Sequence, residues 1–237
     1  MQKRVCKQWS QLFLVLILVM GLRQASAQTL QFVHAVGNAP LVLFDSVYYN
    51  RFGEPFVVNK FKYYISGIEL TDDKQSTTSL SDKYFLINEE DSASKIITLP
   101  IKHNLRKISF LIGVDSARNV SGVQTGSLDP MNAMFWTWNS GYVFAKLEGQ
   151  SEVSPAPQHS FSWHVGGFRQ KENALRRITL ELPPDGNLDT LRIKADLLQW
   201  FDALRPLKIA ITPVCHQPGE LATRLADNYA RMFSVLQ

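Results

Sequence analysis

Short runs in which apolar and polar residues alternate recur along this 237-residue chain, and they restrict its fold more than any other feature. In the first run Leu30, Phe32 and Val36 share one face, and later runs are separated by turn formers such as FGEP and PPDGN. A period of two places successive side chains on opposite faces of a strand. Short strands bounded by Gly, Pro, Asn and Asp are typical of antiparallel sandwiches. The chain is therefore predicted to be all-β, an antiparallel β-sandwich of the Greek-key type.

The pattern also predicts where the elements lie. Two stretches break the alternation: residues 196–202 read as a short helix capped by Asp196, and 219–233 as a C-terminal helix with one apolar stripe. We expect that stripe to pack on the sandwich. Strands are expected at 30–36, 40–49, 60–70, 83–88, 95–99, 107–114, 142–148, 160–165, 177–182, 190–195 and 207–212.

The first 27 residues are predicted to be a secretory signal peptide. Lys3, Arg4 and Lys7 precede the unbroken apolar run 12–20, and Ala25-Ser26-Ala27 supplies the small-residue cleavage pattern. No later segment approaches the roughly 20 apolar residues that a membrane-spanning helix needs. We therefore expect cleavage after Ala27, a periplasmic or otherwise exported protein without membrane insertion, and a single domain over residues 28–237.

Removing this segment changes the charge of the chain. The whole sequence has 25 Lys and Arg against 21 Asp and Glu, and all of the excess lies in residues 1–27, which hold no acid. The remainder is balanced, so nothing in the charge suggests nucleic acid or an anionic membrane as a partner. Cys6 leaves with the signal peptide, and Cys215 alone cannot form an intramolecular disulfide.

Two histidines occupy predicted strands. His34 shares the face of Leu30 and Phe32, so it is either a core histidine bonded to ordinary neighbours or a metal ligand, because neutral imidazole is the commonest metal-binding side chain. In FSWHVGGF, alternation places His164 opposite Trp163, and the glycines that follow leave room for a ligand or another backbone. The alternative for His164 is a surface histidine at a turn.

The other histidines lie outside such strands. His103 and His159 fall in predicted loops and are expected to be solvated. Cys215-His216 places a soft donor beside an imidazole, a pair suited to copper or zinc, although a buried structural thiol is the alternative. The sequence has no P-loop, no GxSxG, no CxxC and no helical HExxH. We therefore do not expect an enzyme.

The segment MFWTWNSGY places Trp136 and Trp138 two residues apart. At strand spacing both rings would share one face, where they could pack in the core or form a stacking platform for a sugar. The residues alone leave both interpretations open.

Several segments resemble one known family. KYYISGIEL, the block from GVDSARNV to FAKLEG, FSWHVGGF, ADLLQWF and PGELATRLADNYARMF are similar to the MbnP-like domain of exported bacterial proteins. The resemblance implies a β-sandwich that binds one copper ion through histidines and a kynurenine, which a MauG-like dihaem partner forms by oxidising a tryptophan. It nominates His164 and His34 as ligands, and Trp136, with Trp138 as the competing choice, as the oxidised residue.

The resemblance has one departure. After the GVDSAR block the chain has Asn119-Val120, where the copper-binding members are expected to have Asn-His. Two functions follow from the sequence. The first is an exported copper-binding protein, and the alternative is a metal-free binding or scaffold module whose FWTWNSGY segment forms a core or a ligand platform.

Overall fold

Strands dominate the computed structural model, which describes residues 28–100, 104–183 and 190–236. The helices are α2 (Ser116–Val120), α3 (Gln199–Asp202) and α4 (Glu220–Tyr229), with 3-10 turns η1 (Ser92–Lys95), η2 (Gly126–Leu128), η3 (Pro130–Asn132), η4 (Pro157–His159) and η5 (Gln170–Glu172). The strands are β1 (Thr29–Val36), β2 (Ala39–Pro40), β3 (Tyr48–Tyr49), β4 (Pro55–Asp72), β5 (Thr77–Asn88), β6 (Ile96–Thr98), β7 (Leu105–Ile112), β8 (Phe135–Thr137), β9 (Gly141–Gln150), β10 (Ser160–Gly166), β11 (Arg176–Glu181), β12 (Thr190–Asp196), β13 (Val214–Cys215) and β14 (Phe233–Val235).

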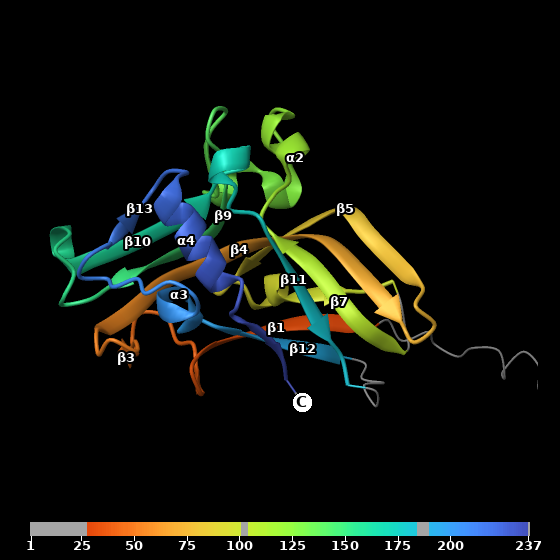
Figure 1. Ribbon diagram of the computed structural model, residues 1–237, viewed down its shortest axis with the longest axis horizontal. Helices are drawn as coiled ribbons and strands as arrows, with labels where there is room; N and C mark the ends of the chain where they lie inside the picture. Colours follow the sequence, from red (N-terminus) through yellow and green to blue (C-terminus); the bar gives the residue numbers. More distant parts are fainter. Residues whose placement is uncertain (1–27, 101–103, 184–189, 237) are drawn as a thin grey trace, which may run out of the picture.

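These strands form two sheets that pack on each other (Figure 1). The smaller sheet has the order β14-β12-β1-β2, with β6 also paired to β1. The larger has the order β11-β7-β4-β9-β10-β13, with β3 and β5 on β4 and β8 on β9. The predicted all-β sandwich is confirmed.

Aromatic side chains fill the space between the sheets. The ring of Phe32 on β1 meets those of Tyr63 on β4 and Phe110 on β7 edge to face, each at 6.0 Å between centroids. All three side chains are buried, as the alternation in β1 requires. Such pairs contribute roughly 0.5–1.5 kcal/mol each beyond the area they bury, so β1 is fastened to both β4 and β7.

The longest strand, β4, joins the parts of the larger sheet. Residues 57–63 pair with β9 and residues 65–72 with β7, while β5 pairs along the opposite edge. The register slips at Gly67, whose φ of 52° lies in the left-handed region that favours glycine. This bulge lets one strand serve two neighbours on the same edge, and the larger sheet curls there.

The helices differ from the prediction. The C-terminal helix ends at Tyr229, and Phe233 begins β14, where its ring packs 5.1 Å from that of Phe110. The predicted cap of the short helix is wrong, because Asp196 belongs to β12 and its carboxylate accepts the N–H groups of Gly37 and Leu198. Tertiary pairing has replaced a local helical signal in both places.

The strand predictions also need two corrections. The sheets are mixed rather than antiparallel, since β1 runs parallel to β12 and β10 parallel to β13. Residues 207–212 form turns instead of a strand, because the buried Glu54 carboxylate accepts the N–H groups of Ile209 and Ala210. Of the strand expected at 40–49, only the short β2 and β3 exist at its ends.

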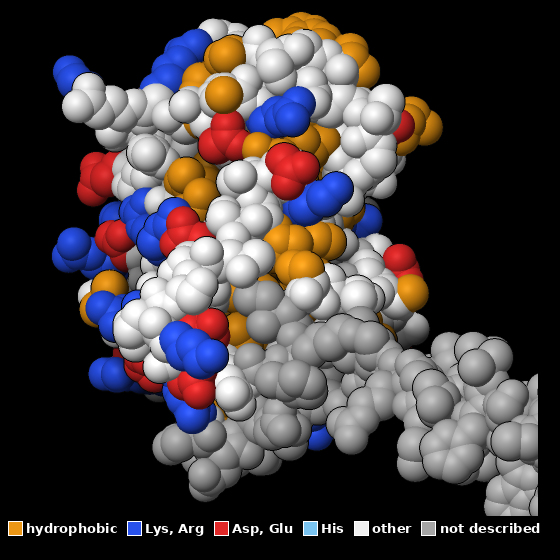
Figure 2. All heavy atoms as spheres, turned by 90° about the vertical axis from the view of Figure 1, so that its right-hand side faces the viewer, with side chains coloured by type: hydrophobic (Ala, Val, Ile, Leu, Met, Phe, Trp, Pro, Cys, Tyr) orange, Lys and Arg blue, Asp and Glu red, His pale blue; other side chains and the backbone are white. Residues whose placement is uncertain are grey.

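The predicted signal peptide and His103 lie outside the described residues. Within the described ranges, no helix combines the length and the apolar character needed to cross a membrane. Figure 2 shows one face of the molecule, on which acidic and basic side chains are interspersed rather than gathered by sign. Such a surface fits the charge balance found for residues 28–237.

Candidate metal centre

The polar side chains of β9 and β10 lie together on the outer face of the larger sheet. The antiparallel register places Lys146 opposite His164 and Glu148 opposite Ser162. Their neighbours in sequence, including Phe161, Trp163 and Val165, are buried in the core. The predicted alternation in FSWHVGGF is therefore confirmed, with His164 on the face away from the core.

A second histidine joins His164 through β13. This strand runs parallel to β10 and aligns Cys215 with Trp163, so the next residue, His216, reaches the outer face. The imidazole rings of His164 and His216 lie 4.5 Å apart between centroids and are tilted by 32°. Cys215 instead points inward, where burial raises the pKa of its thiol to about 11. The structure thus separates the Cys215-His216 pair.

Both imidazoles turn the same nitrogen toward one hydroxyl. Ser162 Oγ lies 3.1 Å from His164 Nε2 and 2.8 Å from His216 Nε2. His164 Nε2 also lies 2.6 Å from Glu148 Oε1, a short contact of the kind made by charge-assisted hydrogen bonds. Two imidazole nitrogens, a carboxylate and a hydroxyl therefore converge at the edge where β9, β10 and β13 meet.

The cluster contains one carboxylate and two ammonium groups, since the Nζ atoms of Lys60 and Lys146 lie 3.8 and 3.9 Å from Glu148. The hydrogen bond from His164 holds the pKa of Glu148 at about 2, so the carboxylate is ionised at neutral pH. Burial lowers the pKa of His216, and the neighbouring His164 lowers it further. Burial also lowers the pKa of Lys146, whose Nζ donates to the Ala133 carbonyl 2.7 Å away. A neutral His216 beside an anionic Glu148 offers lone pairs at neutral pH.

Trp136 lies against the same strand. A Cβ on Gly166 would come within 2.8 Å of the Trp136 ring and 2.4 Å of the Tyr142 carbonyl. Glycine at this position therefore allows the indole to approach β10 two residues after His164, which is the close approach expected of the HVGG glycines. Trp138 has different surroundings: it follows β8, is 57% exposed and meets Phe135 edge to face.

His34 is not part of this arrangement, because it lies on β1 of the smaller sheet. Its ring is buried between the sheets, with Nδ1 2.6 Å from Glu89 Oε2 and Nε2 2.9 Å from the Tyr63 hydroxyl. Tyr63 points to the core side of β4, whereas His164 points to the outer side of β10. The structure brings His164 together with His216, not with His34, and gives both His34 nitrogens ordinary partners.

The remaining predicted positions are peripheral. His159 is exposed, with Nδ1 3.2 Å from the Ser154 carbonyl. Asn119 is buried and holds the backbone of Tyr142, while Val120, where a histidine was expected, is 68% exposed. Across residues 28–100, 104–183 and 190–236, no group of three or more His, Cys, Asp or Glu side chains is already arranged to hold a metal ion. The cluster at β10 is thus two imidazoles and one carboxylate joined by hydrogen bonds.

Sequence reasoning missed Glu148, and it considered His216 only with Cys215, not as a neighbour of His164. The signal for Glu148 was present, because a hairpin between 142–148 and 160–165 places it opposite Ser162. His216 had no such signal, since its place depends on a parallel pairing between segments about 50 residues apart in sequence.

Comparison with known proteins adds the family. The sequence profile of MbnP matches residues 25–217 of this chain. The chain belongs to the MbnP family. Among solved structures, MbnP from Methylosinus trichosporium superimposes with a TM-score of 0.55 at 15% sequence identity, covering 73% of this chain and 76% of that one. At this identity the match shows that the MbnP fold is shared. No curated protein matches the chain.

Proposed function

We propose that this MbnP-family protein is exported and binds one copper ion through His164 and His216, with Glu148 as a third donor. The observation that carries the proposal is the convergence of the two Nε2 atoms on Ser162 Oγ at the outer face of β10. Imidazole nitrogen suits copper, whereas magnesium and calcium prefer sites built from oxygen. The donors that face the site therefore fit copper.

The chain's own groups prepare the site. His164 Nε2–H donates a hydrogen bond to Glu148, and the tautomer that carries the proton on Nδ1 would present the Nε2 lone pair to a metal. Before copper binds, Glu148 accepts this hydrogen bond and orients the ring, and it would then serve as the third donor. Bound copper would supply a redox-active cation, and the partly exposed position of both rings favours binding and delivery over catalysis.

Trp136 is the proposed site of oxidation to kynurenine. Its ring lies against Gly166, two residues after His164 on β10, while Trp138 contacts Phe135 and solvent. Oxidation with dioxygen or peroxide equivalents would cleave the pyrrole ring of the indole, release one carbon as formate and leave a ketone and an aryl amine, so the ring nitrogen would become a donor. We propose a MauG-like dihaem protein as the oxidising partner, in keeping with the family resemblance.

Metal titration of the purified protein tests the copper site. The wild-type protein, stripped of metal, should bind one equivalent of Cu²⁺, with nitrogen hyperfine structure in its electron paramagnetic resonance spectrum. His164→Ala and His216→Ala should each weaken binding by about tenfold or more, in line with losses of individual ligands or their hydrogen-bond partners. His159→Asn is the matched control, because this exposed imidazole lies in η4 and should leave binding unchanged.

Two results would count against the proposal. Binding that survives the double change His164→Ala and His216→Ala would place copper elsewhere, and the absence of stoichiometric binding would favour the metal-free alternative. Peptide mapping of protein from its native host tests the oxidation separately: a gain of about 4 Da on the Trp136 peptide is expected for kynurenine. If copper is bound while Trp136 is unmodified, the kynurenine is excluded and the histidines remain the proposed ligands.

A further inference from the structure

A groove lies between the edge strands of the two sheets, away from the histidine pair. Its volume is about 560 Å³, and on one side it is lined by five successive residues of β11, Arg176 to Leu180. The other side consists of Leu204, which follows α3, and of Asp227, Ala230, Arg231 and Phe233, from the end of α4 to the start of β14. In Figure 1 the C-terminal strand and β11 run side by side at this place.

β11 presents an unpaired backbone edge to this groove. It is the last strand of the larger sheet and pairs with β7 alone among the described strands, while β14 ends the smaller sheet. The N–H of Leu182 donates to the Arg106 carbonyl of the β7 side. In an antiparallel ladder the direction alternates, so the backbone groups of Arg177, Thr179 and Glu181 point away from β7. Such an edge is a template for another strand.

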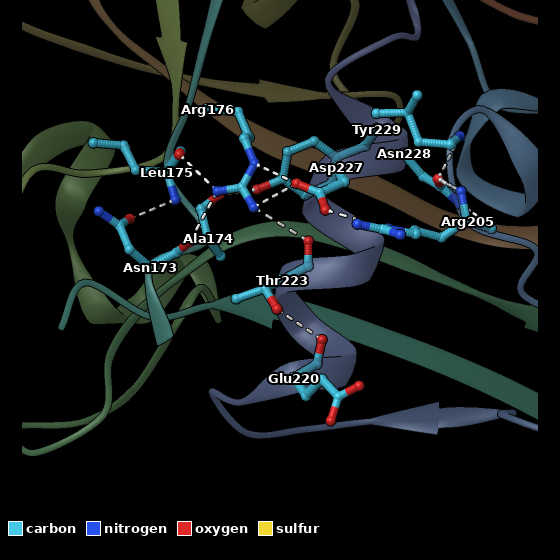
Figure 3. A network of polar contacts seen from close by, with 11 residues as sticks. Asn173, Ala174, Leu175, Arg176, Arg205, Glu220, Thr223, Asp227, Asn228 and Tyr229 are labelled. Carbon is cyan, nitrogen blue, oxygen red and sulfur yellow. Dashed lines mark hydrogen bonds and ion pairs between the residues drawn. The ribbon is translucent and has the colours of Figure 1, made fainter. Parts of the chain in front are cut away.

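Arg176 belongs to the wall of the groove rather than to its binding groups (Figure 3). Its Nε and Nη2 donate to Asp227, and its other N–H groups reach the carbonyls of Asn173, Leu175 and Thr223. All donors of this guanidinium are engaged, and its charge neutralises Asp227 together with Arg205, 3.8 Å away. The clamp holds α4 against the start of β11.

Two other arginines retain free donors. Arg177 uses only Nη1, for Glu69 and Ser109, and its side chain is half exposed. Arg231 is exposed, and no carboxylate in the described part of the chain pairs with it. Because Arg176 and Arg205 neutralise Asp227 and Glu69 pairs with Arg177, the unpaired charge at the groove is that of Arg231, which is positive. Leu204, 53% exposed, adds apolar surface to it, while Phe233 lies buried at its base.

We propose that this groove binds an extended acidic segment of another protein, which adds as a strand to the free edge of β11. Backbone hydrogen bonds to Arg177, Thr179 and Glu181 would supply the pairing, and carboxylates of the segment would meet Arg177 and Arg231. Alternating apolar side chains of the segment would cover Leu204. A second copy of this chain is the alternative occupant, and the experiments below distinguish it from the acidic segment.

Binding of synthetic peptides tests the proposal. The probe is a capped ten-residue peptide that alternates Glu and Val, and the comparison peptide alternates Lys and Val. Fluorescence anisotropy with purified protein should detect the Glu peptide only, and hydrogen exchange should slow at the Thr179 and Glu181 amides. Arg231→Ala should weaken binding by about tenfold, since hydrogen bonds to charged groups are worth about 1.5–3 kcal/mol. Arg224→Ala on α4, outside the groove, is the matched control.

Thr179→Pro separates strand addition from simple charge attraction. The N–H it removes points away from β7, so the ladder with β7 stays intact and proline is tolerated at such an edge. The variant should lose the Glu peptide while copper binding is unchanged. No binding of the Glu peptide, equal binding of the Lys peptide, or binding that survives Thr179→Pro would overturn the proposal. So would concentration-dependent dimerisation that Thr179→Pro abolishes, because a second copy would then occupy the edge.

Discussion

The two histidines that the sequence singled out occupy opposite environments. His34 lies between the sheets with both ring nitrogens bonded, and a neutral ring that donates from Nδ1 to Glu89 and accepts at Nε2 from Tyr63 satisfies each partner. His164 lies on the outer face with a second imidazole beside it, and its Nε2–H donates a hydrogen bond to the ionised carboxylate of Glu148. The comparison teaches that the position of a histidine in a strand does not distinguish a structural residue from a metal ligand. The two are distinguished by whether other donor groups with available lone pairs surround the ring.

The largest expected effect is on stability, at the buried member of this comparison. His34→Ala would leave Glu89 without one partner and Tyr63 with an unsatisfied hydroxyl in the core. We expect a loss of about 3–5 kcal/mol in the free energy of unfolding, as when one partner of a buried charged network is removed. Urea denaturation followed by tryptophan fluorescence measures this. A loss below about 1 kcal/mol would show that the network is not structural.

The surface pair should behave in the reverse manner. His216→Ala should change the free energy of unfolding by less than about 1 kcal/mol, because the ring is exposed and its hydroxyl partner keeps access to water. The same denaturation experiment without metal measures this change. In the wild-type protein, saturating Cu²⁺ should raise the midpoint through its preference for the folded state, and in His216→Ala this increase should shrink. An equal increase in the midpoints of the wild-type protein and the variant would contradict the role of His216 as a ligand.

Gly166→Ala tests the contact that links Trp136 to the pair. The added Cβ would meet the Tyr142 carbonyl and the Trp136 ring, so one of them must move. We expect a destabilisation of about 1–3 kcal/mol, typical of an overpacked site, and a shift in the tryptophan emission spectrum. Gly122→Ala serves as a control for the loss of a glycine, because its Cβ would meet nothing, although its φ of 93° carries its own strain. Equal spectra for both variants would contradict the packing of Trp136 on β10.

The smallest expected effect is the pH dependence of stability. Burial lowers the pKa of His34 from 6.5, outweighing the hydrogen bond to Glu89. Between the folded value and 6.5 the unfolded chain binds more protons, so the free energy of unfolding should fall as the pH decreases through this window. Denaturation midpoints at constant ionic strength measure the slope. His34→Gln should flatten it, and a slope that persists unchanged would assign the effect to another group.

The Glu148 carboxylate affects how stability depends on pH at lower pH values. Glu148, with its pKa held at about 2, contributes stability above its ordinary value of 4.5 that is lost as the pH falls toward 2. Glu148→Gln should weaken the pH dependence in that range alone. Because this side chain is partly exposed, the change should be smaller than that at His34.

The sequence by itself determined the fold class and one half of the candidate site. Period-two alternation separated Trp163 from His164, and buried the face of Phe32 and His34, because side-chain direction along a strand depends only on local backbone geometry. Likewise β9 and β10 are consecutive strands joined by residues 151–159, so their pairing could be read from neighbouring segments. These inferences required no knowledge of contacts between distant parts of the chain.

The tertiary structure decided the rest. The parallel pairing of β13 with β10 brought His216 to His164, and the parallel pairing of β1 with β12 joined residues 161 positions apart, from Thr29 to Thr190. Residues 207–212 form turns because their backbone bonds to the Glu54 carboxylate, and Phe233 lies in a strand rather than a helix because it pairs with β12. Parallel pairing and buried polar contacts gain their free energy only when distant segments meet, so no local pattern records them.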